Sequence, residues 1–263
     1  MKKIILNITL FLIILDVGGQ VDSVRLNSQY LKHYGTDTRD IVIAPVKWGK
    51  KDFMRFGLFA ATTTALVFAD QPVGDFFQRQ RSGRMDKIVD GFFDPLGSKY
   101  SVALGGVFYL VGGIGKNSRM RSTGLLVIES YLASGFLVNI AKRAIGRQRP
   151  DKWGINTPYG WNGPFQGTSF PSGHTTSAFS VATIFALQYK DTKWVPLVAY
   201  GLAGLAGISR VYENRHWASD VFAGAILGTV IGRYIYKAHS KNQLMVVPVT
   251  QNGLTGLKVF VKI

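Results

Sequence analysis

Six apolar segments joined by polar connections constrain this chain more than any other feature of its sequence. We expect all six to be helices, and small residues crowd several of them, which favours the close approach of helix backbones seen in membrane bundles. The fold class that we predict is therefore all-α, a six-helix transmembrane bundle within residues 51–238. The segments are Met54 to Asp70, Ser101 to Gly115, Gly124 to Ala141, Ser172 to Gln188, Trp194 to Ile208 and Asp220 to Tyr236.

The length of the segments leaves a second architecture open. Each has 15 to 18 residues, whereas a membrane-spanning helix needs about 20 apolar residues. Soluble helix bundles use small residues in the same way. A soluble bundle is therefore the alternative to the membrane bundle.

The two ends of the chain differ from this central region. Lys2 and Lys3 precede an apolar run from Ile4 to Leu15, so residues 1–19 are predicted to be a signal peptide, with an uncleaved N-terminal anchor as the alternative. Residues 20–50 are polar and interrupted by glycine and proline, which predicts a loop-rich arm without chemistry. Residues 239–263 form a tail.

The tail carries the pattern of a β-hairpin. Two alternating runs, Leu244 to Thr250 and Leu257 to Ile263, flank a stretch that includes Gln251-Asn252-Gly253. Pro248 is compatible with an edge strand because it lacks a backbone donor.

Charge and cysteine content limit the chemistry. The formal net charge of +16 indicates an anionic partner, such as a phosphate ester, an acidic lipid headgroup or nucleic acid. The chain contains no cysteine, which excludes disulfides, a thiolate nucleophile and a cysteine metal site.

Three stretches at the ends of apolar segments combine residue types that bulk hydrophobicity does not explain. The first, Lys142 to Pro150, packs four cations into eight residues and includes Arg149, whose planar guanidinium can hold two phosphate oxygens. Taken alone, this stretch favours a basic cytoplasmic loop after a membrane helix over a phosphate site.

The second stretch, Pro171 to His174, opens an apolar helix. Free backbone N–H groups at a helix start, together with the Ser172 hydroxyl and the close approach that Gly173 permits, can form an anion site. His174 would then lie beside the anion. The alternative is an ordinary helix cap.

The third stretch runs from Ser209 to Asp220. His216 and Asp220 are four residues apart, hence on one helix face if the helix has begun. A carboxylate on one imidazole nitrogen fixes the tautomer and supports the charge that develops when the other nitrogen attacks, which is the layout of a histidine nucleophile. A helix-capping pair at a membrane surface is the alternative. A metal site is disfavoured because the region is rich in cations and lacks a third ligand nearby.

Together the stretches resemble the type 2 phosphatidic acid phosphatase superfamily, whose signature is Lys-x6-Arg-Pro, Pro-Ser-Gly-His and Ser-Arg-x5-His-x3-Asp. Every specified position matches, the resemblance covers about residues 124–236, and the order of the helices is similar to that of the membrane branch. The resemblance implies phosphomonoester hydrolysis through a phosphohistidine, without a metal or other cofactor.

Roles for individual residues follow from the resemblance. His216 would attack phosphorus, and Asp220 would orient the His216 imidazole. His174 would protonate the leaving alkoxide and then activate water. The phosphate oxygens would be held by Lys142, Arg149, Ser172, Gly173 and Arg210.

Two other features have weaker interpretations. Glu129 lies inside the third apolar segment, where a charge is costly in lipid, so we expect it to face the bundle interior in a structural hydrogen-bonding role. The linker from Trp153 to Phe170 is rich in aromatic residues and is predicted to be either a lid over the phosphate or a membrane-surface anchor.

Basic residues gather at the helix ends opposite the motifs, which by the positive-inside rule places the motifs outside the cytoplasm. A cleaved signal peptide followed by six spans would instead place the motifs in the cytoplasm. We keep the orientation with the motifs outside the cytoplasm. We therefore predict a lipid phosphatase of the bacterial inner membrane whose active site faces the periplasm. The expected partners are a phosphorylated lipid or another phosphomonoester and membrane lipids, not nucleic acid.

Three alternatives to this function remain. A soluble periplasmic acid phosphatase of the same superfamily fits the signal-like N-terminus. A vanadium haloperoxidase-like enzyme would share the anion site. A non-enzymatic protein that binds anionic lipid would need the positive charge but neither the histidines nor Asp220.

Overall fold

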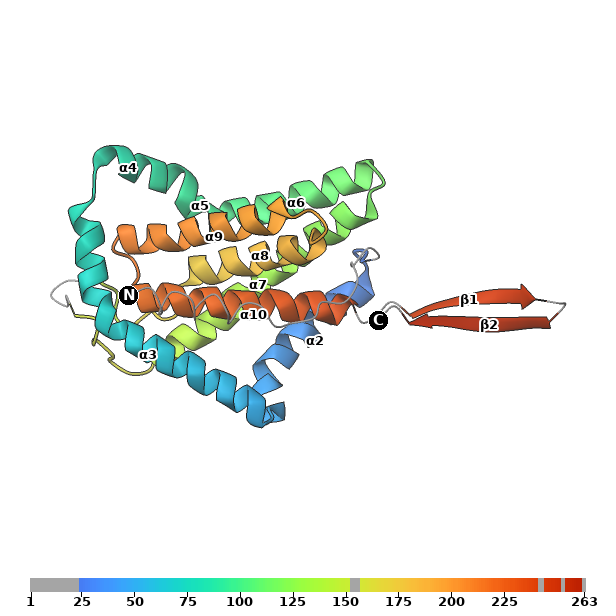
Figure 1. Ribbon diagram of the computed structural model, residues 1–263, viewed down its shortest axis with the longest axis horizontal. Coiled ribbons are helices and arrows are strands. Elements are labelled where there is room, and N and C mark those ends of the chain that lie inside the picture. Colours follow the sequence, from blue (N-terminus) through green and yellow to red (C-terminus); the bar gives the residue numbers. More distant parts are fainter. Residues whose placement is uncertain (1–23, 152–156, 241–243, 252–253, 262–263) are drawn as a thin grey trace.

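A computed structural model describes residues 24–151, 157–240, 244–251 and 254–261 of the chain, and the predicted signal peptide or anchor at residues 1–19 lies outside them (Figure 1). The helices, in chain order, are α2 (Ser28–Ile43), the short 3-10 helix η1 (Ala44–Lys47), α3 (Lys50–Arg79), α4 (Gly83–Ile88), the π-helical η2 (Val89–Phe93), α5 (Asp94–Leu96), α6 (Lys99–Ile114), α7 (Ser118–Ile145), α8 (Gly173–Gln188), α9 (Trp194–Tyr212) and α10 (Ala218–Ser240). The strands are β1 (Leu244–Gln251) and β2 (Leu254–Val261).

Each predicted apolar segment corresponds to a helix, but the predicted number of six is wrong. The residues expected to form a loop-rich arm contain α2, and further short helices connect α3 to α6. Helix α2 forms because the Asn27 side chain accepts a hydrogen bond from the Tyr30 backbone N–H, which caps the helix, and because Tyr30 is buried against α7. These tertiary contacts outweigh the local helix breakers in the arm.

Four helices of the described residues are long and apolar enough to cross a membrane: α3, α7, α9 and α10, with 30, 28, 19 and 23 residues. Helix α6 is apolar but shorter, with 16 residues. The helices exceed the lengths of the apolar segments because each continues through polar residues at its ends. These four helices are therefore long enough to span a membrane, although their apolar segments alone are too short. The described residues do not support six complete spans.

Helix α8 lies inside the bundle and packs against α7, α9 and α10. Small and apolar residues on all its sides are buried, as expected for a helix surrounded by other helices. Glycines spaced by four on α10 bring that helix against the backbone of α8. A Cβ at Gly224 would lie 2.7 Å from the Ser172 carbonyl oxygen, and one at Gly232 would lie 2.6 Å from that of Ser180. The predicted role of small residues in close backbone contact is confirmed for this pair of helices.

The end of α7 shapes the segment that follows. Gly146 adopts a left-handed conformation with φ 66°, which suits glycine and ends the helix. The chain then returns through an irregular segment to the start of α8. This turn separates Lys142, still on α7, from Arg149.

The predicted C-terminal hairpin is present. β1 and β2 are antiparallel, with Leu244 opposite Val261 and Gln251 opposite Leu254. Since the sheet has two strands, Pro248 lies on an edge strand, as expected.

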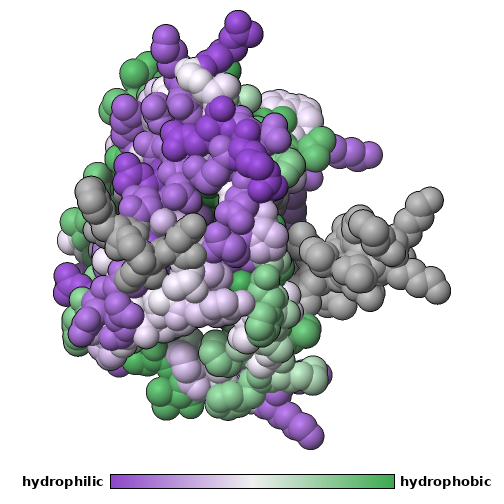
Figure 2. All heavy atoms as spheres, turned by 90° about the vertical axis from the view of Figure 1, so that its left-hand side faces the viewer, coloured by the Kyte–Doolittle hydropathy of each residue, from purple (hydrophilic) through white to green (hydrophobic). Residues whose placement is uncertain are grey.

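The surface divides along the length of the bundle. Large apolar side chains are exposed on the outer helices, including Phe68 of α3, Leu110 of α6 and Leu197 of α9, each more than 60% exposed. An apolar surface of this extent is typical of contact with lipid. Figure 2 views the end where the segment between α7 and α8 gathers, and hydrophilic residues cover much of its centre and upper part.

Candidate active site

A cavity of about 480 Å³ opens at this hydrophilic end of the bundle. Its lining brings together residues of all three sequence stretches: Lys142, Arg149, Gly173, His174, Arg210 and His216. The two remaining predicted site residues, Ser172 and Asp220, are fully buried and are not among the lining residues. Six of the eight predicted residues therefore face one space.

The cations of the first stretch reach the cavity from two elements. Lys142 lies on the last turn of α7, and its Nζ approaches the start of α8, 3.8 Å from where a Cβ at Gly173 would be. Arg149 comes from the irregular segment after Gly146. Burial lowers the pKa of Arg149 from its ordinary value, and the nearby positive charges of Arg215 and Arg210 act in the same direction. Crowded cations of this kind are stabilised by an anion.

The start of α8 presents Gly173 and His174 to the cavity. The Ser172 backbone N–H donates to the Asp220 carbonyl oxygen at 3.0 Å, and its hydroxyl accepts from Thr175 at 2.8 Å. The Ser172 hydroxyl therefore accepts a hydrogen bond within α8, and its own O–H stays available for the predicted contact with phosphate. Gly97 packs against His174 so closely that a Cβ there would lie 2.8 Å from the His174 Cβ.

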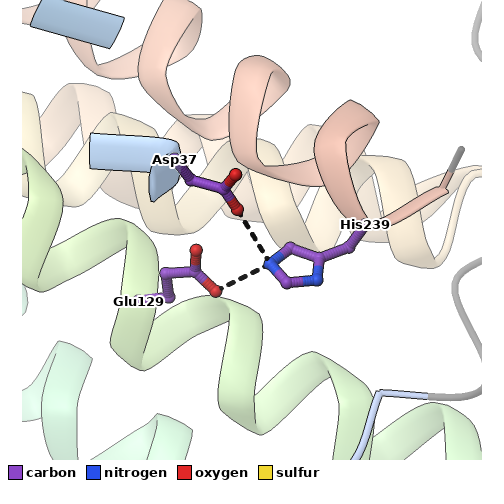
Figure 3. A group of neighbouring side chains, drawn as sticks. All are labelled: Asp37, Glu129 and His239. Carbon is purple, nitrogen blue, oxygen red and sulfur yellow. Dashed lines mark ion pairs between the residues drawn. The ribbon is translucent and has the colours of Figure 1, made fainter. Parts of the chain in front are cut away.

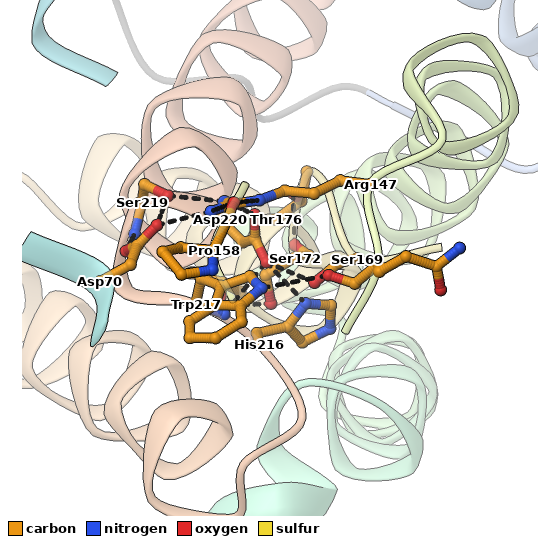
Figure 4. A network of polar contacts seen from close by, with 12 residues as sticks. Asp70, Arg147, Pro158, Ser169, Ser172, Thr176, His216, Trp217, Ser219 and Asp220 are labelled. Carbon is orange, nitrogen blue, oxygen red and sulfur yellow. Dashed lines mark hydrogen bonds and ion pairs between the residues drawn. The ribbon is translucent and has the colours of Figure 1, made fainter. Parts of the chain in front are cut away.

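His216 precedes α10, and its Nδ1 faces the Oδ2 of Asp220 at 3.6 Å (Figure 4). This separation is longer than a hydrogen bond, although catalytic contacts often tighten when a ligand binds. The Asp220 carboxylate is fixed independently: Oδ2 accepts from the Ser169 hydroxyl at 2.5 Å and from the Trp217 backbone N–H at 3.0 Å. With Nδ1 toward Asp220, Nε2 is the imidazole nitrogen left for a substrate.

A buried ion network behind His216 was missed by the sequence reasoning. Arg147 is fully buried, and its guanidinium binds Asp220 Oδ1 at 2.6 Å and Asp70 Oδ2 at 2.7 Å (Figure 4). Asp70 also accepts from the Ser219 backbone N–H at 2.7 Å. The network joins α3 and the segment after α7 to α10, and it holds Asp220 in place. Two features of the sequence could have indicated this network: Asp70 at the end of an apolar segment and Arg147 in the basic stretch, where the family signature specifies no residue.

Two acidic residues at the cavity were also missed. Asp94 Oδ1 lies 2.6 Å from Arg210 Nη1 and 3.1 Å from His174 Nε2. Glu213 pairs with Arg210 one turn away. Arg210 is therefore neutralised by carboxylates in this structure, and a phosphate would compete with Asp94 for both Arg210 and His174. Asp94 stands in a short helix between apolar segments, where no motif marks it.

The two histidines are neutral at physiological pH. Burial lowers the pKa of His216 to about 4, against the opposing effect of Asp220. Burial and the charge of Arg210 lower the pKa of His174 to about 4, against the effect of Asp94. Burial raises the pKa of Glu213 to about 7 despite Arg210. The neutral form of His216 leaves one imidazole nitrogen with a free lone pair, and the pKa of His174 stays low even beside the Asp94 carboxylate.

The predicted lid is only partly described. Trp153 lies outside the described residues, whereas Trp161 packs over the Arg147 guanidinium with 4.8 Å from Cζ to the ring centroid. Trp161 therefore covers the buried ion network, and nothing in this contact tests a lid over the phosphate.

The fold and the cavity define a class: a helical membrane protein with a polar cavity lined by two histidines and four basic side chains. The PAP2 superfamily model matches residues 123–244. A lipid A 1-phosphatase of Rhizobium etli is 30% identical over 200 residues, which cover 70% of this chain and 82% of that protein. The chain belongs to the PAP2 superfamily.

Further similarities agree with this membership. A lipid A 1-phosphatase of Porphyromonas gingivalis is 38% identical over 128 residues, which cover 47% of this chain and 26% of that protein. The crystal structure of a transmembrane PAP2 type phosphatidylglycerolphosphate phosphatase from Bacillus subtilis superposes with a TM-score of 0.56 at 25% identity, over 73% of this chain and 95% of that one. The predicted family and the predicted enzyme class, a phosphatase, are confirmed.

Proposed function

We propose that this chain hydrolyses the phosphomonoester of a membrane lipid in the cavity between α7, α8 and α9. The observation that carries the proposal is the convergence of Lys142, Arg149, His174, Arg210 and His216 on one space. Three cations and two neutral histidines provide charge for a phosphate, a nucleophile and a proton carrier. Relatives named as lipid A 1-phosphatases support a lipid substrate.

The reaction proceeds in two steps. His216 Nε2 attacks phosphorus and forms a P–N bond while the P–O bond to the lipid breaks, and the leaving alkoxide takes a proton from His174. His174 then removes a proton from water, whose oxygen attacks the phosphohistidine and breaks the P–N bond. Inorganic phosphate leaves, and both histidines return to their starting states.

The phosphate itself prepares His174 for the first step. A phosphate monoester brings about two negative charges beside the imidazole, more than the single charge of Asp94 with which it competes, and so raises the low pKa of His174. His174 then carries the proton when substrate is bound. Lys142, Arg149 and Arg210 hold the oxygens on which transition-state charge gathers. Asp220, fixed by Arg147, orients His216.

The membrane and its orientation belong to the same proposal. We infer a location in the bacterial inner membrane with the cavity facing the periplasm, because basic residues gather at the opposite helix ends. The four long apolar helices favour a membrane enzyme over a soluble periplasmic acid phosphatase. Extraction without detergent tests this point, since recovery in the soluble periplasmic fraction would reject the membrane assignment.

A phosphate-release panel of the purified protein tests the reaction. We expect turnover of lipid phosphates to exceed that of soluble phosphate esters. His216→Ala should abolish release and the trapping of a covalent phosphoenzyme, whereas Lys142→Ala should weaken phosphate binding or transition-state stabilisation. Substantial turnover by the His216 variant would rule out the nucleophile assignment.

A further inference from the structure

A second group of ionisable side chains lies at the other end of the bundle from the cavity. Asp37 of α2, Glu129 of α7 and His239 of α10 converge there (Figure 3). Glu129 is 13 residues before Lys142 on the same helix, or about 20 Å at the usual rise per residue. The group is therefore separate from the phosphate site.

The geometry of the group is that of ligands around a common centre. His239 Nε2 lies 3.0 Å from Glu129 Oε2 and 3.3 Å from Asp37 Oδ2. All three ligand atoms lie within 4.8 Å of one another. Ligands bound to one metal at 2.0–2.2 Å are separated from each other by about 2.8–3.6 Å in octahedral or tetrahedral geometry. Both distances from Nε2 fall inside that range.

The Glu129 carboxylate supplies an independent observation. It is 2% exposed, and its one ion pair among the described residues joins Oε2 to His239 Nε2 at 3.0 Å. Its Oε1 has no hydrogen-bond partner among those residues. Figure 3 shows the carboxylate directed at the imidazole. Burying an ionised carboxylate costs several kcal/mol, so a group placed this way needs a positive charge beside it.

Charge balance distinguishes a metal from a proton as the source of that positive charge. Within the described part of the chain, no lysine or arginine forms an ion pair with Asp37 or Glu129. A protonated His239 would bring one positive charge, and its single Nε2–H would face two carboxylates. A divalent cation bound to a neutral imidazole cancels both charges and uses all three ligand atoms.

The surroundings provide support and access. The Tyr30 ring packs against the His239 ring with 5.4 Å between centroids, and the Tyr30 hydroxyl donates to the Leu125 carbonyl oxygen at 3.0 Å. A cavity of about 160 Å³, whose lining includes Tyr30 and His33, meets the group at His239 and has room for water.

We propose that Asp37, Glu129 and His239 bind a divalent first-row transition metal ion that fastens α2 to α7 and α10. One imidazole nitrogen and two carboxylate oxygens suit Zn²⁺ or Mn²⁺. The ion is structural and lies too far from His216 to contact the substrate.

Zn²⁺ binding by the purified full-length protein in detergent tests the proposal. After treatment with EDTA and desalting, the wild type should bind one more Zn²⁺ per chain than Glu129→Gln or Asp37→Asn, measured by elemental analysis, with affinity at least about 100-fold weaker in the variants. Asp40→Asn is the matched control because it removes a carboxylate from the same helix outside the group, and it should bind like the wild type.

Thermal unfolding provides the second measurement. Zn²⁺ should raise the Tm of the wild type and of Asp40→Asn, and it should leave that of Asp37→Asn unchanged. Asp37 lies at the rim on α2 and is only partly buried, so its variant remains informative if Glu129→Gln does not fold. Equal Zn²⁺ binding by all four proteins, or no effect of Zn²⁺ on the wild type, would overturn the proposal in favour of a protonated histidine.

Discussion

At the scale of single residues, the position of Asp220 in the candidate active site depends on a buried ion network with Arg147 and Asp70. The Arg147 guanidinium contacts Asp70, Asp220 and the Pro158 carbonyl oxygen. The side chains of Arg147, Asp70 and Asp220 are fully buried. Removing one partner of such a network leaves an uncompensated charge in a low-dielectric interior. The network therefore contributes both to stability and to the position of the Asp220 carboxylate.

Arg147→Met should destabilise the protein by about 3–5 kcal/mol, because Asp70 and Asp220 then lose their shared cation. Unfolding in detergent, followed by circular dichroism, measures the change. Arg143→Met is the control, since Arg143 is exposed in the same basic stretch and should shift stability by no more than about 0.5 kcal/mol. Equal losses for the two variants would contradict the assigned role of Arg147.

The pH dependence of kcat/KM should reflect the low pKa of His216. Attack requires the neutral imidazole, and burial lowers its pKa to about 4, so the nucleophile is lost only as the pH falls through about 4. The substrate phosphate itself titrates at about pH 6, and its contribution must be subtracted from the profile. The acid limb of kcat/KM that remains should lie near pH 4. Asp220→Asn removes a charge that raises this pKa, and its limb should move lower. A limb for the wild type at the ordinary histidine value would refute the assignment.

At the scale of helices, α8 and α10 pack closely because the glycines of α10 at the contact have no side chain. A Cβ at Gly228 would overlap the Thr176 carbonyl oxygen, and Gly224 and Gly232 make similar contacts one turn on either side. Because α8 carries His174 and α10 begins next to His216, this packing sets the separation of the two histidines. Small residues on one helix thus determine the width of the site.

Gly228→Ala should destabilise the protein by about 1–3 kcal/mol, because the added methyl must push α10 away from α8. The same variant should also lower kcat by separating the histidines. Gly201→Ala on α9 adds its Cβ where no atom lies within 4 Å. That control should be neutral or slightly stabilising, by at most about 1 kcal/mol. Thermal unfolding and phosphate release of both variants decide the point.

At the scale of the whole molecule, the two ends of the bundle have different chemistry. The candidate active-site cavity lies at the hydrophilic end shown in Figure 2, and the group around Glu129 lies toward the other end. Four long apolar helices connect the ends. This arrangement fits a protein that crosses the membrane with its reaction on one side only.

The orientation can be tested by labelling, since the sequence has no cysteine. Asn162→Cys places a thiol at the cavity end, and Lys193→Cys places one at the opposite end, both at exposed positions. In intact cells with a permeable outer membrane, a membrane-impermeant maleimide should label the first and spare the second. Both should react in lysed cells. The reverse pattern would place the cavity in the cytoplasm.

The sequence by itself determined the helices of the six apolar segments and six of the residues that line the cavity. The six apolar segments are strong helix signals, and the spacing within the three stretches is local, so Lys142, Arg149, His174, Arg210 and His216 were identified without coordinates. Helix α2 was missed because its stability comes from Tyr30 packing against α7, a contact across 95 positions in the sequence.

Only the tertiary structure decided which charges meet. Arg147 pairs with Asp70 across 77 positions and with Asp220 across 73, and Asp94 reaches Arg210 from a short helix that no motif marks. Glu129 faces the bundle interior as expected, but its partner His239 and the neighbouring Asp37 of the arm were not predicted. Local patterns establish the elements, because helix periodicity and motif spacing act over a few residues. The partner of a buried charge depends on how helices distant in sequence pack, because burial without a partner is too costly to persist.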